Sequence, residues 1–146
     1  ELLRDKYKLP GMKILQFAFD GNEKNPYLPK NILGDNWVVY TGTHDNATST
    51  SWWASLDNIL KNNLNDNYNF SNDPSWNLIE IGMKTKAKLF IAPLQDILSL
   101  DDSSRLNTPG TTINNWRWKL SKSLDSIEIN LQKYSDLGNT YGRLRN

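Results

Sequence analysis

The sequence predicts an α/β fold in which parallel strands alternate with helices. Three mainly apolar runs of strand length lie at residues 12–19, 37–41 and 88–92, and segments with apolar residues at helical spacing lie between and after them. A glycine, a proline or an aspartate follows each run. This order of elements is typical of a parallel sheet that is covered by helices.

The first strand is expected to follow the end of a helix. Residues 1–8 are predicted to form its last turns, and Leu9-Pro10-Gly11 stops it, because proline disfavours helix at the preceding residue and glycine supplies a turn. Residues 12–19 then form a predicted strand that is buried on both faces. Residues 21–36, with their prolines and asparagines, are expected to form an ordered loop over the strand ends.

Two helices are predicted between the second and third strands. Apolar residues near a 3.6 period indicate a helix over residues 50–62, and an Asn- and Asp-rich loop is expected at 61–72. Asp73 is suited to cap the next helix, and Pro74 fits its first turn, where the missing N–H costs nothing. The chain then enters the third strand, which Pro93 closes.

The last third of the chain predicts one more helix. Residues 95–98 are expected to form a short turn or helix, and residues 105–111 a loop. A final helix is indicated by apolar side chains at three- and four-residue steps, namely Leu120, Leu124, Ile127, Leu131 and Tyr134. Three parallel strands leave two open edges and bare apolar faces, so we expect partner strands from elsewhere or a larger protein.

Composition excludes several classes of function. The 146 residues carry a net charge of +1 with well-mixed charges, which gives no electrostatic case for a nucleic acid or a membrane partner. No apolar run approaches the roughly 18 residues of a membrane span. The absence of cysteine excludes disulfides and thiol chemistry, and the first residues lack the layout of a signal peptide. We therefore expect a cytoplasmic protein, or one of the plastid stroma.

Polar side chains follow the first two predicted strands. His44, the chain's single histidine, and Asp45 come shortly after the second strand, and Asp20 follows the first. α/β enzymes place catalytic groups at the carboxyl ends of parallel strands. Because these ends meet at one edge of the sheet, Asp20 and Asp45 are expected to lie near each other.

This pattern allows several chemical interpretations. One histidine with scattered carboxylates offers too few ligands for zinc or iron, so we expect no metal and no other cofactor. No Gly-x-Ser-x-Gly elbow is present to expose a nucleophilic serine. Paired carboxylates at Asp20 and Asp45 suit glycoside chemistry, which places two carboxyl groups around the scissile bond. The structural alternative is that Asp20 turns the chain and Asp45 caps the following helix.

Short blocks along nearly the whole chain carry a family resemblance. They are Leu9-Pro10-Gly11-Met12, Leu15-Gln16-Phe17-Ala18-Phe19-Asp20, Asn25-Pro26-Tyr27-Leu28-Pro29, Tyr40-Thr41-Gly42-Thr43-His44-Asp45-Asn46, Trp52-Trp53, Pro93-Leu94-Gln95-Asp96, Arg105-Leu106-Asn107-Thr108-Pro109-Gly110 and Asn115-Trp116-Arg117-Trp118. In this order and spacing, the blocks resemble those of the amylomaltases, also called disproportionating enzymes or 4-α-glucanotransferases.

The resemblance implies a (β/α)₈ TIM barrel and a retaining transfer of α-1,4-glucan to the 4-hydroxyl of another sugar. The family uses an aspartate nucleophile, a glutamate acid/base and a third aspartate that stabilises the transition state. Asp45 matches this third aspartate, and His44 and Asn107 match contacts to the transferred sugar. Asp20 matches a contact on the acceptor side. The implied partners are maltooligosaccharides and longer α-1,4-glucans.

The resemblance also indicates what this chain lacks. The family's nucleophile and acid/base precede the Leu9–Met12 block, where only about eight residues stand here, and Glu1 is not in the acid/base motif. Residues 1–146 are therefore interpreted as the carboxyl-terminal portion, about three β/α units, of one barrel domain. This portion is expected to be inactive without the amino-terminal part of the barrel. A non-catalytic glucan-binding module and an inactive truncated product without a stable fold are the alternatives.

Overall fold

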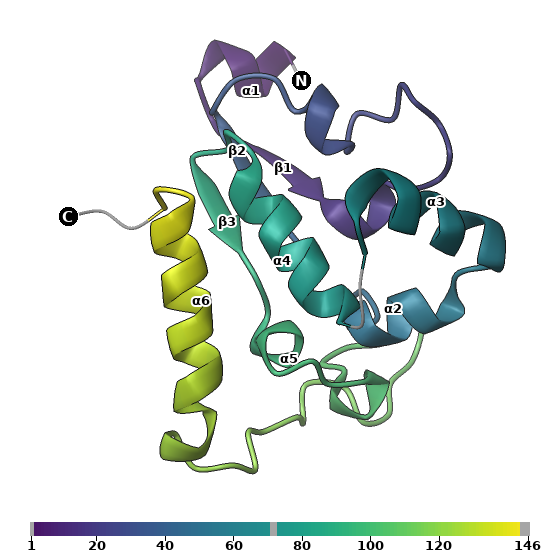
Figure 1. The fold of residues 1–146 in the computed structure, drawn as a ribbon, viewed down its shortest axis with the longest axis vertical. Coiled ribbons are helices and arrows are strands. Elements are labelled where there is room, and N and C mark those ends of the chain that lie inside the picture. The colour runs from purple at the N-terminus through teal and green to yellow at the C-terminus, as the bar shows by residue number, and fades with distance from the viewer. Residues whose placement is uncertain (1, 71–72, 144–146) are drawn as a thin grey trace.

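A three-stranded parallel sheet lies at the centre of the structure (Figure 1). The computed structural model describes residues 2–70 and 73–143. Strands β1 (Gly11–Ile14), β2 (Trp37–Tyr40) and β3 (Leu89–Ile91) stand in the order β1-β2-β3, and both neighbouring pairs are parallel. The predicted α/β arrangement with parallel strands is therefore confirmed.

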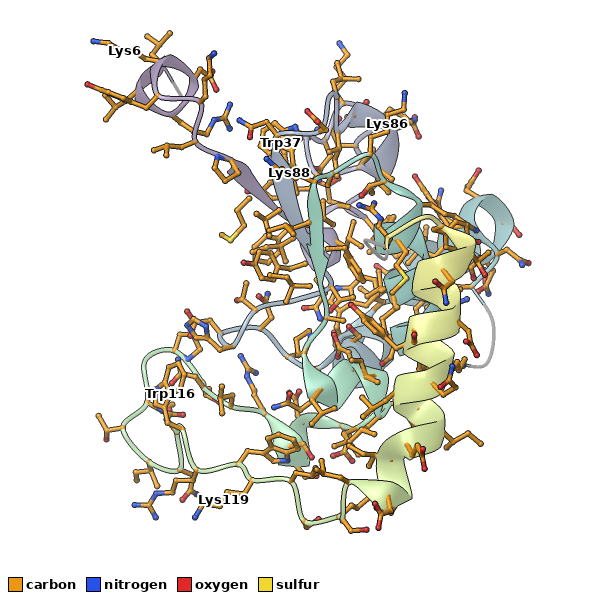
Figure 2. All side chains as sticks on the ribbon, turned by 90° about the vertical axis from the view of Figure 1, so that its left-hand side faces the viewer. Lys6, Trp37, Lys86, Lys88, Trp116 and Lys119 are labelled. Atoms are coloured by element: carbon orange, nitrogen blue, oxygen red, sulfur yellow. The ribbon has the colours of Figure 1, made fainter. Side chains whose placement is uncertain are left out.

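Helices connect β2 to β3, whereas β1 is connected to β2 by a loop with two 3-10 turns. The bounds of the helices are α1 (Leu2–Lys6), α2 (Ser49–Ser55), α3 (Asn58–Tyr68), α4 (Pro74–Lys84), α5 (Leu94–Ile97) and α6 (Glu128–Thr140), with 3-10 turns at 15–17, 29–31, 102–104 and 125–127. In the views of Figures 1 and 2, α4 and α6 lie on one side of the sheet. None of the helices in the described ranges has the length and apolar character that a membrane span requires.

The two faces of the sheet differ in what covers them. Successive side chains of a strand point to opposite faces, and the register places Val39 beside Phe90 on the face that the helices cover. Val39 is fully buried there. On the other face, Met12, Leu89 and Ile91 keep 54%, 51% and 42% of their surface exposed. We refer to this second face, with these three residues, as the open face.

Two apolar clusters hold the helices in place. The first lies among the 3-10 turn over residues 15–17, β2, α3 and α4 and includes the buried side chains Leu15, Val39, Leu64 and Leu78. The second joins α4 to α5 and α6 through Trp76, Ile79, Met83 and Ile97. Burial of such side chains stabilises the fold by about 1.5–3 kcal/mol each.

Side-chain caps fix the starts of three helices. Thr48, Asp57 and Asp73 each accept a hydrogen bond from the backbone N–H three residues later, at the starts of α2, α3 and α4. Pro74 occupies the first turn of α4. The predicted beginning of that helix is therefore confirmed.

The predicted strand over residues 12–19 is wrong beyond Ile14. The β1–β2 ladder ends at the Ile14–Tyr40 pair, and residues 15–17 then form a 3-10 turn in which the Gln16 N–H donates to the Thr41 carbonyl at 3.1 Å. The apolar residues of this run are still mostly buried, with Leu15 completely so. An unbroken apolar run indicates burial and does not by itself distinguish a strand from a buried turn.

The predicted helix over residues 50–62 is two helices. Asp57 caps the start of α3, and this helix continues to Tyr68. The predicted loop over 61–72 is therefore wrong up to residue 68, while residues 71 and 72 lie outside the described residues. Asn and Asp have weak helix propensity, but α3 buries Leu64 completely in the core, and tertiary packing overrides propensity.

The last helix begins later than the apolar pattern indicates. Helix α6 starts at Glu128 and not near Leu120, after a 3-10 turn over residues 125–127. Leu124 is 70% exposed, whereas Ile127 is buried. Helix α6 then packs against the second apolar cluster through Tyr134 and Leu137.

Candidate active site

A buried carboxylate joins the carboxyl ends of β2 and β3. Asp96, in α5 just after β3, is 1% exposed. Its Oδ2 accepts hydrogen bonds from Thr41 Oγ1 at 2.5 Å and Ser49 Oγ at 2.7 Å, and its Oδ1 accepts the Ser49 N–H at 2.8 Å. Burial raises the pKa of Asp96, and these hydrogen bonds act in the opposite direction. Asp96 thus ties the end of β2 and the start of α2 to β3.

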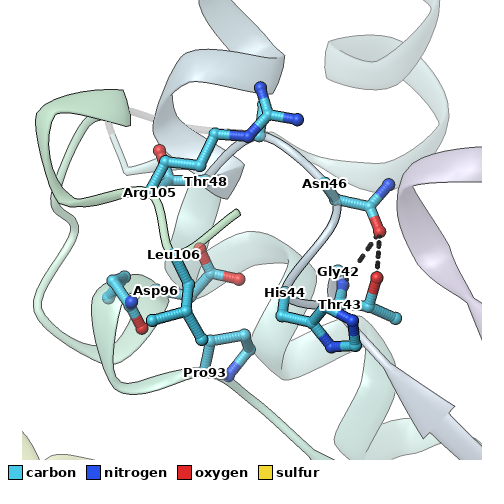
Figure 3. A pocket seen from close by; sticks show the side chains of 11 residues that line it. Gly42, Thr43, His44, Asn46, Thr48, Pro93, Asp96, Arg105 and Leu106 are labelled. Carbon is cyan, nitrogen blue, oxygen red and sulfur yellow. Dashed lines mark hydrogen bonds between the residues drawn. The ribbon is translucent and has the colours of Figure 1, made fainter. Parts of the chain in front are cut away.

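A tight turn follows β2 and presents the two predicted site residues. The Asn46 Oδ1 accepts hydrogen bonds from the Thr43 N–H at 2.9 Å and from Thr43 Oγ1 at 2.7 Å (Figure 3). Between these residues, the side chains of His44 and Asp45 are 51% and 50% exposed. The turn therefore holds both groups where a ligand can reach them.

An amide and an imidazole contact the carboxylate of Asp45. Asn107 Nδ2 donates to Asp45 Oδ1 at 2.5 Å, and His44 Nε2 lies 3.4 Å from the same oxygen. The amide donor therefore fixes the orientation of the carboxylate, while half of the Asp45 side chain stays accessible.

A second loop is bound to the backbone of this turn. The Asn107 N–H donates to the His44 carbonyl at 3.2 Å. The Arg105 guanidinium donates from Nη2 to the Asp45 carbonyl at 2.8 Å and from Nε to the Asn107 carbonyl at 2.9 Å. We call residues 105–107 the clamp, because their bonds fix the turn from outside the sheet.

Two hollows adjoin the turn and the clamp. One is a cavity of about 250 Å³, whose lining includes His44, Asp96 and Arg105 (Figure 3). The other, of about 780 Å³, lies over the open face and is lined by apolar side chains of all three strands together with His44 and Asp45. His44 lines both hollows, as do other residues of the turn, so the turn separates the two.

The structure brings three of the four predicted site residues together. His44, Asp45 and Asn107 make the contacts given above, while Asp20 lines neither hollow. Asp20 Oδ1 accepts the Asn22 N–H at 2.9 Å, and this bond is the main cause that lowers the pKa of Asp20. Asp20 thus turns the chain, as the structural alternative expects, and is not paired with Asp45 in the described residues.

The structural alternative fails for Asp45. Thr48, and not Asp45, accepts the hydrogen bond that caps α2. Asp45 instead bonds to a residue 62 positions further along the chain. Capping of α2 therefore does not explain the position of Asp45.

Three residues at the site were not predicted as site residues. Arg105, Asp96 and Trp116 all lie in the blocks that carry the family resemblance, and that is the only sequence signal for them. The Trp116 ring lies 4.9 Å from the His44 ring, centroid to centroid. Hydrogen bonds between distant loops cannot be read from the spacing of residues along the chain.

The geometry limits the chemistry of the described residues. An accessible carboxylate beside an imidazole and an amide can accept and donate hydrogen bonds to a polar ligand such as a sugar. Retaining glycoside cleavage also needs a nucleophile and an acid/base on either side of the bond. Asp96 is buried and fully engaged, and no three His, Cys, Asp or Glu side chains within the described ranges are placed to hold a metal ion.

Comparison with known proteins gives one consistent result. The model of the 4-alpha-glucanotransferase family matches residues 1–125. The chain is 42% identical over 146 residues to the chloroplastic/amyloplastic 4-alpha-glucanotransferase of Arabidopsis thaliana, covering 97% of this chain and 25% of that protein. It is 41% identical over 128 residues to the 4-alpha-glucanotransferase of Thermus thermophilus, covering 82% of this chain and 26% of that protein.

A solved structure shows the same arrangement of the backbone. The amylomaltase from Streptococcus agalactiae, solved in complex with acarbose, matches with a TM-score of 0.89 and 26% sequence identity, over 99% of this chain and 29% of that one. The chain spans about a quarter of the length of the curated relatives it matches. The matched region includes His44, Asp45 and Asn107.

Proposed function

This chain belongs to the 4-alpha-glucanotransferase family, and from that premise we propose that it forms one side of the active site of an α-1,4-glucan transferase. The enzyme breaks an α-1,4 bond in a donor glucan and passes the released segment to the 4-hydroxyl of an acceptor sugar. The hydrogen bond between Asn107 and Asp45 carries the proposal, because it joins two family blocks at the carboxyl ends of the strands. That edge is where barrel enzymes place their active sites.

Within this site, we propose that Asp45 stabilises the transition state. An oxocarbenium-like sugar is positively charged and flattened, and hydroxyl contacts that tighten as the ring flattens lower the barrier. The oriented carboxylate of Asp45 serves this purpose, and His44 and Asn107 bind hydroxyls of the same sugar. Asp20, exposed and ionised after β1, is proposed to contact the acceptor glucan.

The groups that break the bond are proposed to come from outside these 146 residues. We propose that the chain is the carboxyl-terminal portion, about three β/α units, of a TIM (β/α)₈ barrel. Its open face and the free edges of β1 and β3 support this, because barrel closure removes edges and fills the interior with side chains. The amino-terminal part of the barrel is then its partner, and the site is completed between them.

An assay with maltotriose tests this division of roles. The 146-residue chain alone is expected to release no glucose, whereas the complete barrel converts maltotriose into glucose and longer oligosaccharides. The longer products distinguish transfer from hydrolysis. Turnover by the chain alone would show that it holds its own nucleophile, and a complete barrel without transfer would exclude the proposed function.

A non-catalytic glucan-binding module is the second candidate. It is favoured by one observation: the described residues supply sugar-binding groups without the pair of groups that cleaves the bond. Saturable binding of maltooligosaccharides by the chain, together with a complete barrel that has no transferase activity, would support the module.

We place the protein in the cytoplasm or, as the names of the plant relatives suggest for those proteins, in a plastid.

A further inference from the structure

Trp116 is exposed in a backbone conformation that its side chain disfavours. Its φ is +61°, in the left-handed region, and 61% of its surface is exposed. A positive φ is an outlier for a bulky residue, and such strain persists only where the surroundings impose it. Trp116 also belongs to neither of the two apolar clusters. Filling the core therefore does not explain its position.

Hydrogen bonds within the surrounding loop fix the backbone at Trp116. The Trp116 N–H donates to the carbonyl of Leu106, in the clamp, at 2.6 Å. The preceding Asn115 accepts the Thr108 N–H at 2.9 Å through Oδ1. The indole then meets the His44 ring at an interplanar angle of 44°. Figure 2 shows Trp116 in a loop on the side of the molecule away from α6.

An exposed indole at this place matches the chemistry of a sugar ring. Glucose has an apolar face of C–H groups and a rim of hydroxyls, so it is bound by a flat apolar surface together with polar groups at its edge. Trp116 supplies the flat surface, and its neighbour His44 supplies a polar group. Trp116 lines neither hollow, but its ring contacts His44, which lines both, and much of the indole stays exposed. The exposed part of the indole therefore adjoins the space in which a glucose unit would meet His44.

We propose that Trp116 is a glucan-binding residue, whose indole packs against the apolar face of a glucose unit bound beside His44. The inference rests on the proposed function, since it names a further contact of the same site. The strained backbone is maintained because it directs the ring toward the bound glucan.

Kinetics of the complete enzyme with maltotriose test the contact. Trp116→Ala is expected to raise KM about tenfold, with kcat within about twofold, because the lost apolar contact weakens binding of the substrate. Trp116→Phe keeps a flat ring and is expected to change KM by less than about threefold. Ile113→Ala, at a 75% exposed position in the same loop, is the matched control and is expected to change neither constant.

The kinetic outcomes separate the contact from other roles. A fall in kcat at unchanged KM would assign Trp116 to positioning His44 and would overturn the inference. Unchanged kinetics of Trp116→Ala in an active enzyme would overturn it as well, while leaving the proposed function intact. A wild-type enzyme that neither binds nor converts maltotriose would overturn both.

A spectroscopic readout is independent of turnover. In protein labelled with 5-fluorotryptophan, the fluorine resonance that disappears in Trp116→Phe belongs to Trp116. This resonance is expected to shift saturably as maltotriose is added, while that of Trp37, at the amino end of β2, stays in place. A Trp116 resonance that does not move at saturating maltotriose would contradict the contact, whatever the kinetics of the variants.

Discussion

At the residue scale, the candidate site depends on how the protein orients the carboxylate of Asp45 and leaves it accessible. Its carboxylate accepts a hydrogen bond from the neutral amide of Asn107, and half of its surface stays open to a ligand. Asp96 is the contrasting case, since its oxygens are buried and bonded to Thr41 and Ser49. One carboxylate is therefore available for chemistry, and the other holds the backbone that carries it.

Replacing the charge of Asp45 tests its role. Asp45→Asn keeps an oxygen that accepts the Asn107 hydrogen bond but removes the negative charge. In the complete enzyme, we expect kcat for maltotriose to fall about a hundred- to thousandfold, because charge stabilisation acts mainly in the transition state. KM is expected to change little. A kcat within threefold of wild type would exclude Asp45 as the stabilising group.

Arg105 is expected to act by positioning the turn. Its guanidinium bonds to the carbonyls of Asp45 and Asn107, and this fork geometry is not available to lysine. Arg105→Ala and Arg105→Lys are both expected to lower kcat about tenfold, since a small displacement of the turn misplaces the carboxylate. Added guanidinium is expected to restore part of the activity of Arg105→Ala. Thr112→Ala, at an exposed position of the same loop, serves as the control. If added guanidinium does not restore any activity of Arg105→Ala, a positioning role is contradicted.

At the scale of elements, the sequence predicted the features that local chemistry determines. The Asp73-Pro74 helix start is set by neighbouring residues, and α4 begins where it was expected. The first helix does end before Leu9-Pro10-Gly11, but it stops at Lys6, two residues earlier than expected, and Gly11 already belongs to β1. The end of β1 at Ile14 depends on its partner strand, and the length of α3 depends on the burial of Leu64. Such features arise from tertiary contacts, which residue spacing does not contain.

The same limit applies to the site. His44 and Asp45 were predicted from their place after a strand, whereas Asn107 was expected at the site only from the family resemblance, and its bond to Asp45, which spans 62 residues, was not predicted. Asp20 also follows β1 in the sequence, yet the 3-10 turn over residues 15–17 carries the chain onward, and Asp20 lines neither hollow at the site. The error in the strand end therefore produced the error in the expected pairing.

Helix α6 is joined to α4 by a polar contact as well as by its apolar face. Tyr141 Oη donates to Glu80 Oε1 at 2.7 Å, and Lys84 Nζ lies 2.7 Å from the same oxygen. Arg143 adds hydrogen bonds to the carbonyls of Met83, at 2.8 Å, and Thr85 near the end of α4. These bonds satisfy carbonyl groups that a helix end leaves without partners.

The Glu80 contact predicts a pH dependence of stability. The hydrogen bonds from Lys84 and then Tyr141 lower the pKa of Glu80 below its ordinary value of 4.5. The contact therefore stabilises the fold above pH 4.5, and this stabilisation is lost as the pH falls through the lowered pKa. Because the groups are partly exposed, Glu80→Gln is expected to lower the free energy of unfolding by only about 0.5–1 kcal/mol at pH 7.

Urea unfolding of wild type and Glu80→Gln at a series of pH values checks this prediction. The difference between the two proteins is expected to shrink as the pH falls below 4.5. Asp66→Asn, which removes an exposed carboxylate of α3, is the control for the change in net charge. A difference that stays constant with pH would mean that ionised Glu80 does not stabilise the packing of α6.

At the scale of the whole molecule, the open face links the fold to the proposed function. Aligned residues of the three strands form cross-sheet rows, one of Met12, Val38 and Leu89 and the next of Ile14, Tyr40 and Ile91. In a closed barrel, such rows are the layers that fill the interior. The hollow above them reaches His44 and Asp45. In the proposed barrel, the open face would therefore pack the interior and also form the floor of the active site.

A charge on the open face is expected to separate folding of this chain from completion of the barrel. Leu89→Lys places an ammonium where Leu89 is 51% exposed in this chain but is proposed to be buried in the barrel. We expect the 146-residue chain to keep its helical content and to associate less, because the apolar face is interrupted. The complete enzyme is expected to lose both assembly and activity, since a buried unpaired charge costs several kcal/mol. Ile59→Lys, at a 79% exposed position of α3, is the matched control and is expected to leave the complete enzyme unaffected. If Leu89→Lys leaves the complete enzyme folded and active, the open face is not the interior of a barrel, and the partner that covers it has to be sought on another surface.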